Sequence, residues 1–450
     1  MKKNEIVRLC ITDITNEGNG VGRADDGMAV FVPFTAVGDV VDVKIVKVQK
    51  SFAYGITEKL VERSQSRCDA DCEVFYKCGG CSLRHISYES ELEIKQGYVE
   101  ASMTRIGKLD VEFEKILGCE KTEGYRNKAQ YPVTMLNGEA VCGFYSKRSH
   151  RVVPVKHCKL QPKVFSEICN QVLKFHNDNK IPVYDEITGK GLLRHIYIRR
   201  GESSGEIMLC LVLTKLREDI YRGFAEYIAK CFPDIKSVVM NLNPKNTNVI
   251  LGRKCVTLYG NDTITDIMCQ NKIEISPLSF YQVNTKQAEK LYGIAKDYAN
   301  LSKNDTVLDL YCGAGTIGLS MAREVKKVIG VEVVEDAIKN ANRNAQLNGI
   351  KNAEFICGDS GEIAQKLVER GECPDVIIAD PARKGCDKLS LDAMIKLSPS
   401  RIVMVSCNHT TAARDCAYLC ENGYKTEKCR AVDLFPKTTH VECVILMSRK

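Results

Sequence analysis

The chain has 450 residues, of which 44% are hydrophobic and 27% charged, and its formal net charge is +7. This length exceeds what one ordinary core supports, so we expect two or three folded units. No secretory signal follows the N-terminus, and no run approaches the roughly 18 apolar residues of a membrane span, so we expect a cytoplasmic, non-membrane protein. The charge excess alone is too small to indicate a nucleic-acid partner.

Cysteine is abundant, with 22 residues in the chain. Because the expected compartment is reducing, we exclude a disulfide scaffold and expect most cysteines, such as Cys169 and Cys210, to be small buried hydrophobes. Only cysteines grouped at ligand spacing, or placed in a special chemical setting, indicate a function.

Residues 1–62 predict a small all-β unit. Runs rich in Val and Ile alternate with turn signals such as Glu17-Gly18-Asn19-Gly20. Small barrels with basic loops often bind nucleic acids. The segment resembles a TRAM domain, an OB-like RNA-binding β-barrel appended to RNA-modifying enzymes, through Gly20-Val21-Gly22-Arg23 followed by Val30-Phe31-Val32-Pro33.

Residues 63–275 predict a central unit of mixed α+β structure. Helical periodicity occurs over 165–175 and 219–231, and strand-like runs occur over 195–198, 207–213 and 237–241. Near its start, Cys72-x5-Cys78-x2-Cys81 places three thiols on one short loop, and Cys158 is available as a distant fourth, with Cys68 as an extra cysteine nearby. By ligand type, four thiolates suit zinc and an iron–sulfur cluster equally well.

Residues 276–450 predict a third unit in which short apolar strands alternate with helices. The expected strands are 306–311, 327–332, 353–357, 376–379 and 401–406. This rhythm predicts a mostly parallel, doubly wound sheet, which is a Rossmann-like α/β domain.

A glycine-rich turn follows the first of these strands. Gly313 and Gly315 would let the backbone approach a nucleotide, and the helix that opens at Thr316 offers unpaired N–H groups. Glu332 ends the next strand, about twenty residues after the turn, and a carboxylate at this distance typically binds the ribose hydroxyls of a nucleotide. The turn lacks the third glycine of a dinucleotide fingerprint. The pattern therefore predicts a nucleoside cofactor other than a dinucleotide.

Four features follow one another in the order found in Rossmann-like methyltransferases, which this part of the chain resembles: the glycine-rich turn, Glu332, Gly358-Asp359 and Asp380-Pro381. The resemblance implies S-adenosylmethionine as the cofactor, with Glu332 on the ribose, Asp359 on the adenine edge and residues 311–316 on the methionine part. Taken alone, Asp359 is also explained as the cap of a helix.

Three residues near the C-terminus are candidates for catalysis. Cys407 follows a predicted core strand, at the edge where open α/β sheets bind ligands. Two possible bases follow: His440 has the better intrinsic pKa, while burial can raise the pKa of Glu442 into a useful range. These residues alone leave the choice of base open.

Five motifs in a fixed order resemble the RNA uracil-5-methyltransferases: Ser279-Phe280-Tyr281-Gln282-Val283-Asn284, Asp309-Leu310-Tyr311-Cys312-Gly313, Asp380-Pro381-Ala382-Arg383, Ser406-Cys407-Asn408, and Phe435-Pro436 through His440-Val441-Glu442. The resemblance implies methyl transfer to carbon 5 of a uridine. Cys407 would be the nucleophile that adds to carbon 6, and Glu442 the base that removes the carbon-5 proton. Gln282, Tyr311, Glu332 and Asp380 match cofactor-contacting positions, and His440 takes a supporting role.

The cysteine group resembles the [4Fe-4S] site of the family members that act on ribosomal RNA. This implies a cluster held by Cys72, Cys78, Cys81 and Cys158, with zinc as the alternative. Transfer-RNA members generally lack both the cluster and a TRAM segment, so the resemblance favours 23S ribosomal RNA of the large subunit, with transfer RNA as the alternative. We expect a monomer.

Two other functions compete with this interpretation. An RNA cytosine-5-methyltransferase uses similar thiolate chemistry, but it has a cysteine after the proline of the fourth motif, where this chain has Ala382-Arg383. A non-catalytic RNA-binding iron–sulfur protein is disfavoured because both Cys407 and Glu442 are present.

Overall fold

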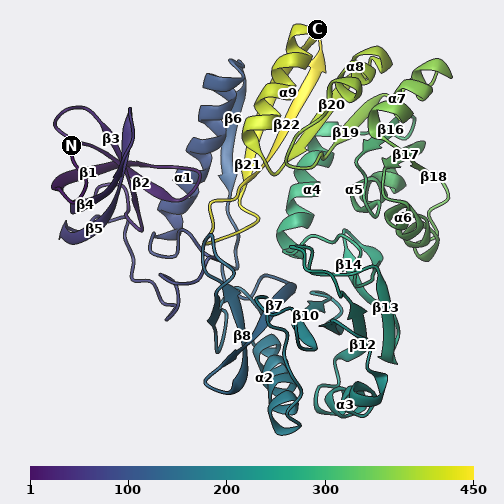
Figure 1. Ribbon diagram of the computed structural model, residues 1–450. Coiled ribbons are helices and arrows are strands. Elements are labelled where there is room, and N and C mark those ends of the chain that lie inside the picture. The colour runs from purple at the N-terminus through teal and green to yellow at the C-terminus, as the bar shows by residue number, and fades with distance from the viewer.

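The computed structural model describes residues 1–450, and Figure 1 shows a small barrel, a central sheet and a C-terminal sheet arranged around a common junction. Five strands close the barrel in the order β1-β2-β3-β5-β4. Their alternating buried side chains form its core, which confirms the expected N-terminal barrel. The strands are β1 (Ile6–Ile14), β2 (Asn19–Arg23), β3 (Ala29–Pro33), β4 (Val40–Val48) and β5 (Phe52–Glu62).

The central unit is a seven-stranded sheet in the order β13-β12-β11-β10-β7-β8-β9, in which only β11 and β12 pair in parallel. Two amphipathic helices, α2 (Lys163–Asp178) and α3 (Glu218–Cys231), bury their apolar stripes on it. The strands are β7 (Lys128–Leu136), β8 (Glu139–Tyr145), β9 (Val152–Pro154), β10 (Leu193–Arg200), β11 (Ile207–Leu213), β12 (Ile235–Leu242) and β13 (Lys254–Gly260), and a separate hairpin follows, β14 (Ile264–Met268) with β15 (Asn271–Ile275).

The C-terminal unit is an eight-stranded sheet in the order β18-β17-β16-β19-β20-β22-β21-β6. The first five strands run in parallel, whereas β22 is antiparallel to both of its neighbours. The expected Rossmann-like fold is thereby confirmed. The strands are β6 (Glu112–Leu117), β16 (Thr306–Leu310), β17 (Lys327–Glu332), β18 (Ala353–Cys357), β19 (Val376–Ala379), β20 (Arg401–Ser406), β21 (Tyr424–Val432) and β22 (Glu442–Arg449).

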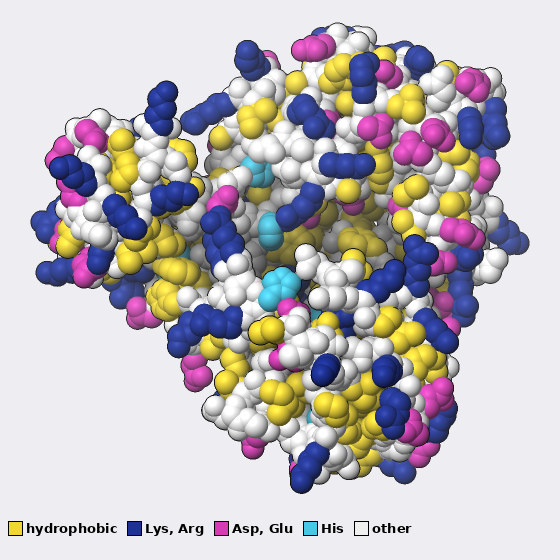
Figure 2. Space-filling model, in the orientation of Figure 1, with side chains coloured by type: hydrophobic (Ala, Val, Ile, Leu, Met, Phe, Trp, Pro, Cys, Tyr) yellow, Lys and Arg dark blue, Asp and Glu magenta, His cyan; other side chains and the backbone are white.

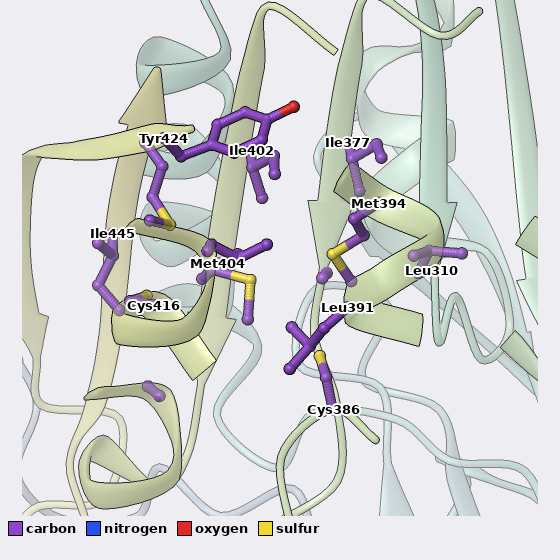
Figure 3. Close-up of a cluster of buried hydrophobic side chains, with 14 of the residues drawn as sticks. Leu310, Ile377, Cys386, Leu391, Met394, Ile402, Met404, Cys416, Tyr424 and Ile445 are labelled. Atoms are coloured by element: carbon purple, nitrogen blue, oxygen red, sulfur yellow. The ribbon is translucent and has the colours of Figure 1, made fainter. Parts of the chain in front are cut away.

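Helices cover both faces of this sheet, so its strands are continuous hydrophobic runs. One face packs against α1, α7, α8 and α9, and Leu310, Ile377 and Met394 are among the side chains of this cluster labelled in Figure 3. The other face packs against α4 and α5. None of the helices combines the length and apolarity needed to cross a membrane. The helices are α1 (Tyr88–Ala101) with its extension η1 (Ser102–Ile106), α4 (Thr285–Ala299), α5 (Thr316–Met321) with η2 (Ala322–Glu324), α6 (Glu335–Leu347), α7 (Ser360–Glu369), α8 (Lys388–Leu397) and α9 (His409–Glu421).

One strand of the C-terminal sheet comes from far earlier in the chain. β6 pairs in parallel with β21, and α1 packs beside it, although both lie within the range 63–275 that the sequence assigns to the central unit. The chain thus crosses from the barrel to the C-terminal sheet before it forms the central sheet. As a result, α1 lies between the barrel and α9 in Figure 1.

Candidate active site

The carboxyl ends of the parallel strands collect the candidate cofactor residues at one edge of the sheet. Because β16, β17, β18, β19 and β20 run in the same direction, the loops that follow them meet at this edge. These loops begin with Tyr311, Val333, Gly358, Asp380 and Cys407. Figure 2 shows a hollow between the three units, with histidines inside it and Lys and Arg side chains around it.

The glycine-rich turn connects β16 to α5. Gly315 caps α5 with φ of 77°, and a Cβ there would lie 2.8 Å from the ring of Phe355, so only glycine fits. The backbone N–H of Gly313 donates to Glu332 Oε2 at 3.2 Å, which holds the turn against the end of β17. The hydroxyl of Tyr311, a non-glycine residue at φ of 63°, donates to Ser390 Oγ at 3.0 Å.

A tyrosine that the sequence did not single out links three of the candidate cofactor residues. The Tyr292 hydroxyl lies 3.3 Å from Thr316 Oγ1. Burial raises the pKa of Tyr292, the charge of Asp380 adds to this, and hydrogen bonds with Thr316 and Gln282 oppose it. The backbone carbonyl of Gln282 accepts a 2.8 Å bond from Asn127 Nδ2. The loop before α4 is therefore fixed beside the glycine-rich turn.

Two further acids at this edge, Asp309 and Asp359, differ in environment. Asp309, fully buried at the end of β16, accepts a 2.9 Å bond from the N–H of Gly318. Burial raises its pKa to about 7, and the charges of Asp380 and Glu332 add to this. Asp359 caps α7 and accepts bonds from the N–H groups of Gly361 and Glu362, at 3.0 and 3.3 Å. Its position as a helix cap is thus observed directly.

Strand pairing brings Cys407 and Glu442 side by side. β20 and β22 are antiparallel, with Ser406 opposite Cys443. Cys407 directly follows β20 and Glu442 is the first residue of β22, so the two residues lie at the same edge of the sheet. Burial raises the pKa of Glu442 to about 8, and Asp380 raises it further while Arg383 opposes. Burial also raises the pKa of the Cys407 thiol to about 11, with contributions from Glu442 and Asp380. The three groups therefore form one electrostatically coupled set.

Arg383 is the cation of this set; its motif was recognised from the sequence, but no role was assigned to its side chain. It lowers the pKa values of both Cys407 and Glu442. Its Nη2 lies 2.8 Å from His440 Nδ1, and burial together with this cation lowers the pKa of His440 to about 4. Asn408 Nδ2 donates to the Arg383 carbonyl at 2.8 Å, which ties the loop after β19 to the start of α9. His440 is therefore neutral and turned toward the guanidinium.

The segment 433–441, which leads into Glu442, is fixed by a buried ion network. Lys95 Nζ lies 2.7 Å from Glu91 Oε1 and 2.7 Å from Asp433 Oδ1, and all three side chains are fully buried. The backbone N–H of Lys437 also donates to Glu91, at 2.6 Å. Since Glu91 and Lys95 lie on α1, this helix holds the loop that carries the candidate base.

We expect Lys95→Met to lower the free energy of unfolding by about 3–5 kcal/mol, because it leaves the buried Asp433 carboxylate without its cation and Glu91 with only Lys437, at 3.5 Å. Denaturant unfolding measures this change. The matched control is Lys290→Met, which removes an exposed pair with Glu120 and should cost no more than about 1 kcal/mol. Equal losses in the two variants would show that the buried network does not stabilise the segment.

The four cysteines of the sequence motif surround a single cavity of about 270 Å³. Burial raises the pKa of Cys158, and the nearby thiols of Cys81, Cys78 and Cys72 add to this. No three His, Cys, Asp or Glu side chains converge closely enough to hold one metal ion. Next to this loop, the N–H groups of Ser82 and Leu83 donate to the carbonyl of Lys437, at 3.0 and 3.1 Å.

The doubly wound sheet, with its glycine-rich turn and Glu332 at the carboxyl edge, has the architecture of the S-adenosylmethionine-dependent methyltransferases. Comparison with known proteins agrees. The family described as tRNA (Uracil-5-)-methyltransferase matches residues 87–450, and the TRAM domain matches residues 2–57. The chain therefore belongs to the RNA uracil-5-methyltransferase family, and it is an S-adenosylmethionine-dependent RNA methyltransferase with an N-terminal TRAM domain.

Similar proteins share this organisation over their whole length. RNA methyltransferases of Bacillus cereus and Clostridium acetobutylicum are each 43% identical to this chain, and in each case the match covers 100% of the chain and 98% of the relative. Among solved structures, the tRNA (uracil-54, C5)-methyltransferase of Pyrococcus abyssi, in complex with S-adenosyl-L-homocysteine, is 27% identical with a TM-score of 0.78. That match covers 98% of this chain and 99% of the archaeal chain.

Proposed function

We propose that this enzyme methylates carbon 5 of a uridine in 23S ribosomal RNA, with Cys407 as the nucleophile and Glu442 as the base. The observation that carries the proposal is the placement of a thiol and a buried carboxyl side by side, at the ligand-binding edge of a methyltransferase sheet. Uracil methylation at carbon 5 needs one group of each kind.

The chemistry follows from the poor nucleophilicity of carbon 5. The Cys407 thiolate adds to carbon 6 of the uracil, which makes carbon 5 enolate-like. S-adenosylmethionine supplies the methyl group from its sulfonium. Glu442 then takes the carbon-5 proton, the carbon 6–sulfur bond breaks, and the thiolate of Cys407 is released. Arg383 favours the ionised form of both residues.

The pKa values support Glu442, rather than His440, as the base. A general base works best when its pKa lies near the working pH. The pKa of Glu442 is raised to about 8, whereas that of His440 is lowered to about 4 and its ring faces the Arg383 cation. His440 therefore fits a supporting role, in which it orients Arg383.

The same edge fits a positively charged cofactor. Asp309, Asp380 and Glu442 all have raised pKa values because they are buried with few cations nearby. A ligand that carries a sulfonium and an ammonium, as S-adenosylmethionine does, would compensate these carboxylates. We propose the full set of cofactor contacts as Gln282, Tyr311, Gly313, Gly315, Thr316, Glu332, Asp359 and Asp380.

We further propose that Cys72, Cys78, Cys81 and Cys158 hold a [4Fe-4S] cluster. Four thiols line one cavity, and thiolates are the ligands that iron–sulfur clusters take. By ligand type the same four thiols also suit zinc, which is the alternative. Cys81 immediately precedes Ser82 and Leu83, which bond to Lys437. The cluster would thus brace the segment that leads to Glu442.

Anaerobically purified protein should be brown and should contain about four irons and four sulfides per chain. Cys81→Ser should remove the colour and the iron, as measured by absorption and metal analysis. The matched control is Cys68→Ser, which alters the remaining cysteine of the same loop region and should leave both unchanged. Colourless wild-type protein with one tightly bound zinc would reject the cluster and leave the methyltransferase assignment intact.

Transfer RNA is the second candidate substrate, because an archaeal tRNA enzyme matches 98% of this chain, barrel included. A tRNA enzyme can therefore share the whole architecture, so the barrel does not by itself identify ribosomal RNA. The test is to incubate the protein and methyl-labelled cofactor separately with unmodified 23S ribosomal RNA and with tRNA transcripts. We expect label in the ribosomal RNA. Label found only in tRNA would show that tRNA, and not ribosomal RNA, is the substrate.

A further inference from the structure

A groove next to the candidate nucleophile is not used by the chemistry above. It has a volume of about 630 Å³ and lies between the barrel, α1 and the first turn of α9. Its lining includes Thr15 of the barrel, Tyr98 of α1, Arg105 of η1 and His409 of α9. Since His409 is only two residues beyond Cys407, one end of the groove lies near the candidate nucleophile.

The walls of the groove are fixed by specific contacts. The Tyr98 hydroxyl donates to the carbonyl of Thr15 at 2.7 Å, which joins α1 to the barrel. Ser102 Oγ lies 2.6 Å from His409 Nδ1, which joins η1 to α9. The rings of Tyr98 and His409 are near-parallel, with 20° between their planes and 6.0 Å between their centres. The two rings form a preorganised aromatic surface.

A helix-interior glycine opens this groove. Gly97 lies within α1 and lines the cavity, and a Cβ built on it would meet no atom within 4 Å. Gly97 therefore leaves the helix side of the groove without a side chain, and a larger residue at this position would enter the groove.

We propose that the groove binds an unpaired nucleotide of the RNA substrate, close along the strand to the target uridine. Proteins recognise unpaired bases by stacking them on aromatic side chains. The lining offers such a surface together with hydroxyl and carbonyl groups, and its one cation, Arg105, is accompanied by the acids Asp13 and Glu93. This chemistry suits a base and its ribose better than a phosphate. The inference rests on the proposed function for the identity of the RNA.

The test variant is Gly97→Gln, which places a side chain in the groove. The control is Gly223→Gln in α3 of the central unit, where a Cβ would also meet no atom within 4 Å. Both variants should fold, because glutamine favours helix over glycine. A fluorescein-labelled single-stranded oligouridylate serves as the probe. Gly97→Gln should weaken its Kd about tenfold, the size of one lost stacking contact, while Gly223→Gln binds as the wild type does. Equal binding by the two variants would overturn the proposal.

A second measurement places the nucleotide directly. An oligouridylate containing 5-iodouridine, irradiated on the wild-type protein, should cross-link to Tyr98 or His409, as mapped by mass spectrometry. Cross-links found only on other residues would contradict the proposal. Neither measurement depends on methyl transfer. If the protein binds this probe in the groove but forms no 5-methyluridine, the proposed function is wrong and the proposed groove is still supported.

Discussion

Cys407→Ala should abolish methylation of RNA and the formation of any covalent enzyme–RNA complex. Alanine has no group that can add to carbon 6, and without that addition carbon 5 stays a poor nucleophile. By analogy with the removal of a nucleophile in other enzymes, we expect the single-turnover rate to fall by roughly 10⁴-fold or more. The measurement is transfer of labelled methyl groups to RNA, with denaturing gels to detect the covalent complex.

The control for this variant is the neighbouring cysteine on β22. Cys443 is fully buried, and its thiol contacts the Ser406 carbonyl at 3.6 Å. Cys443→Ala removes only a small buried group, so its activity should stay within a few-fold of wild type. Retention of substantial activity by Cys407→Ala would mean that another group attacks carbon 6.

Glu442→Gln should stop the reaction one step later. The amide keeps the size of the side chain but cannot accept the carbon-5 proton, whereas methyl transfer precedes that step. Turnover should fall by about 10²–10⁴-fold. A methylated protein–RNA adduct should accumulate and survive denaturing gels, because the bond from Cys407 to carbon 6 can no longer break.

The matched variant is His440→Gln, which removes the contact with Arg383 but leaves Glu442 in place. It should lower the rate without trapping the adduct. If His440→Gln traps the adduct and Glu442→Gln does not, while both bind RNA normally, the histidine is the base.

Several parts of this architecture could be predicted because their signals are local. Buried parallel strands are continuous apolar runs, and the alternation of strands and helices over 306–406 predicted the doubly wound sheet. The carboxyl edge of such a sheet also determines where Cys407 and the glycine-rich turn lie. The barrel was similarly visible from its short strands and turns.

Other parts could not be predicted because they depend on pairs of residues far apart in the chain. β6 joins β21 across more than 300 residues of sequence, and no local pattern encodes that pairing. Lys and Arg side chains are usually exposed to solvent, so the sequence does not indicate the roles of Lys95 and Arg383. Their roles become visible only in the fold, where Lys95 contacts Asp433 and Arg383 lies near Glu442. The choice between Glu442 and His440 likewise depends on burial and on the position of Arg383.

The most direct test of the central claim is the identity of the modified nucleoside. RNA methylated by the wild-type protein with labelled S-adenosylmethionine is digested to nucleosides and separated by chromatography with mass detection. We expect the label to appear as 5-methyluridine and to disappear with Cys407→Ala. Label in 5-methylcytidine, or 5-methyluridine formed equally well by the alanine variant, would contradict this claim.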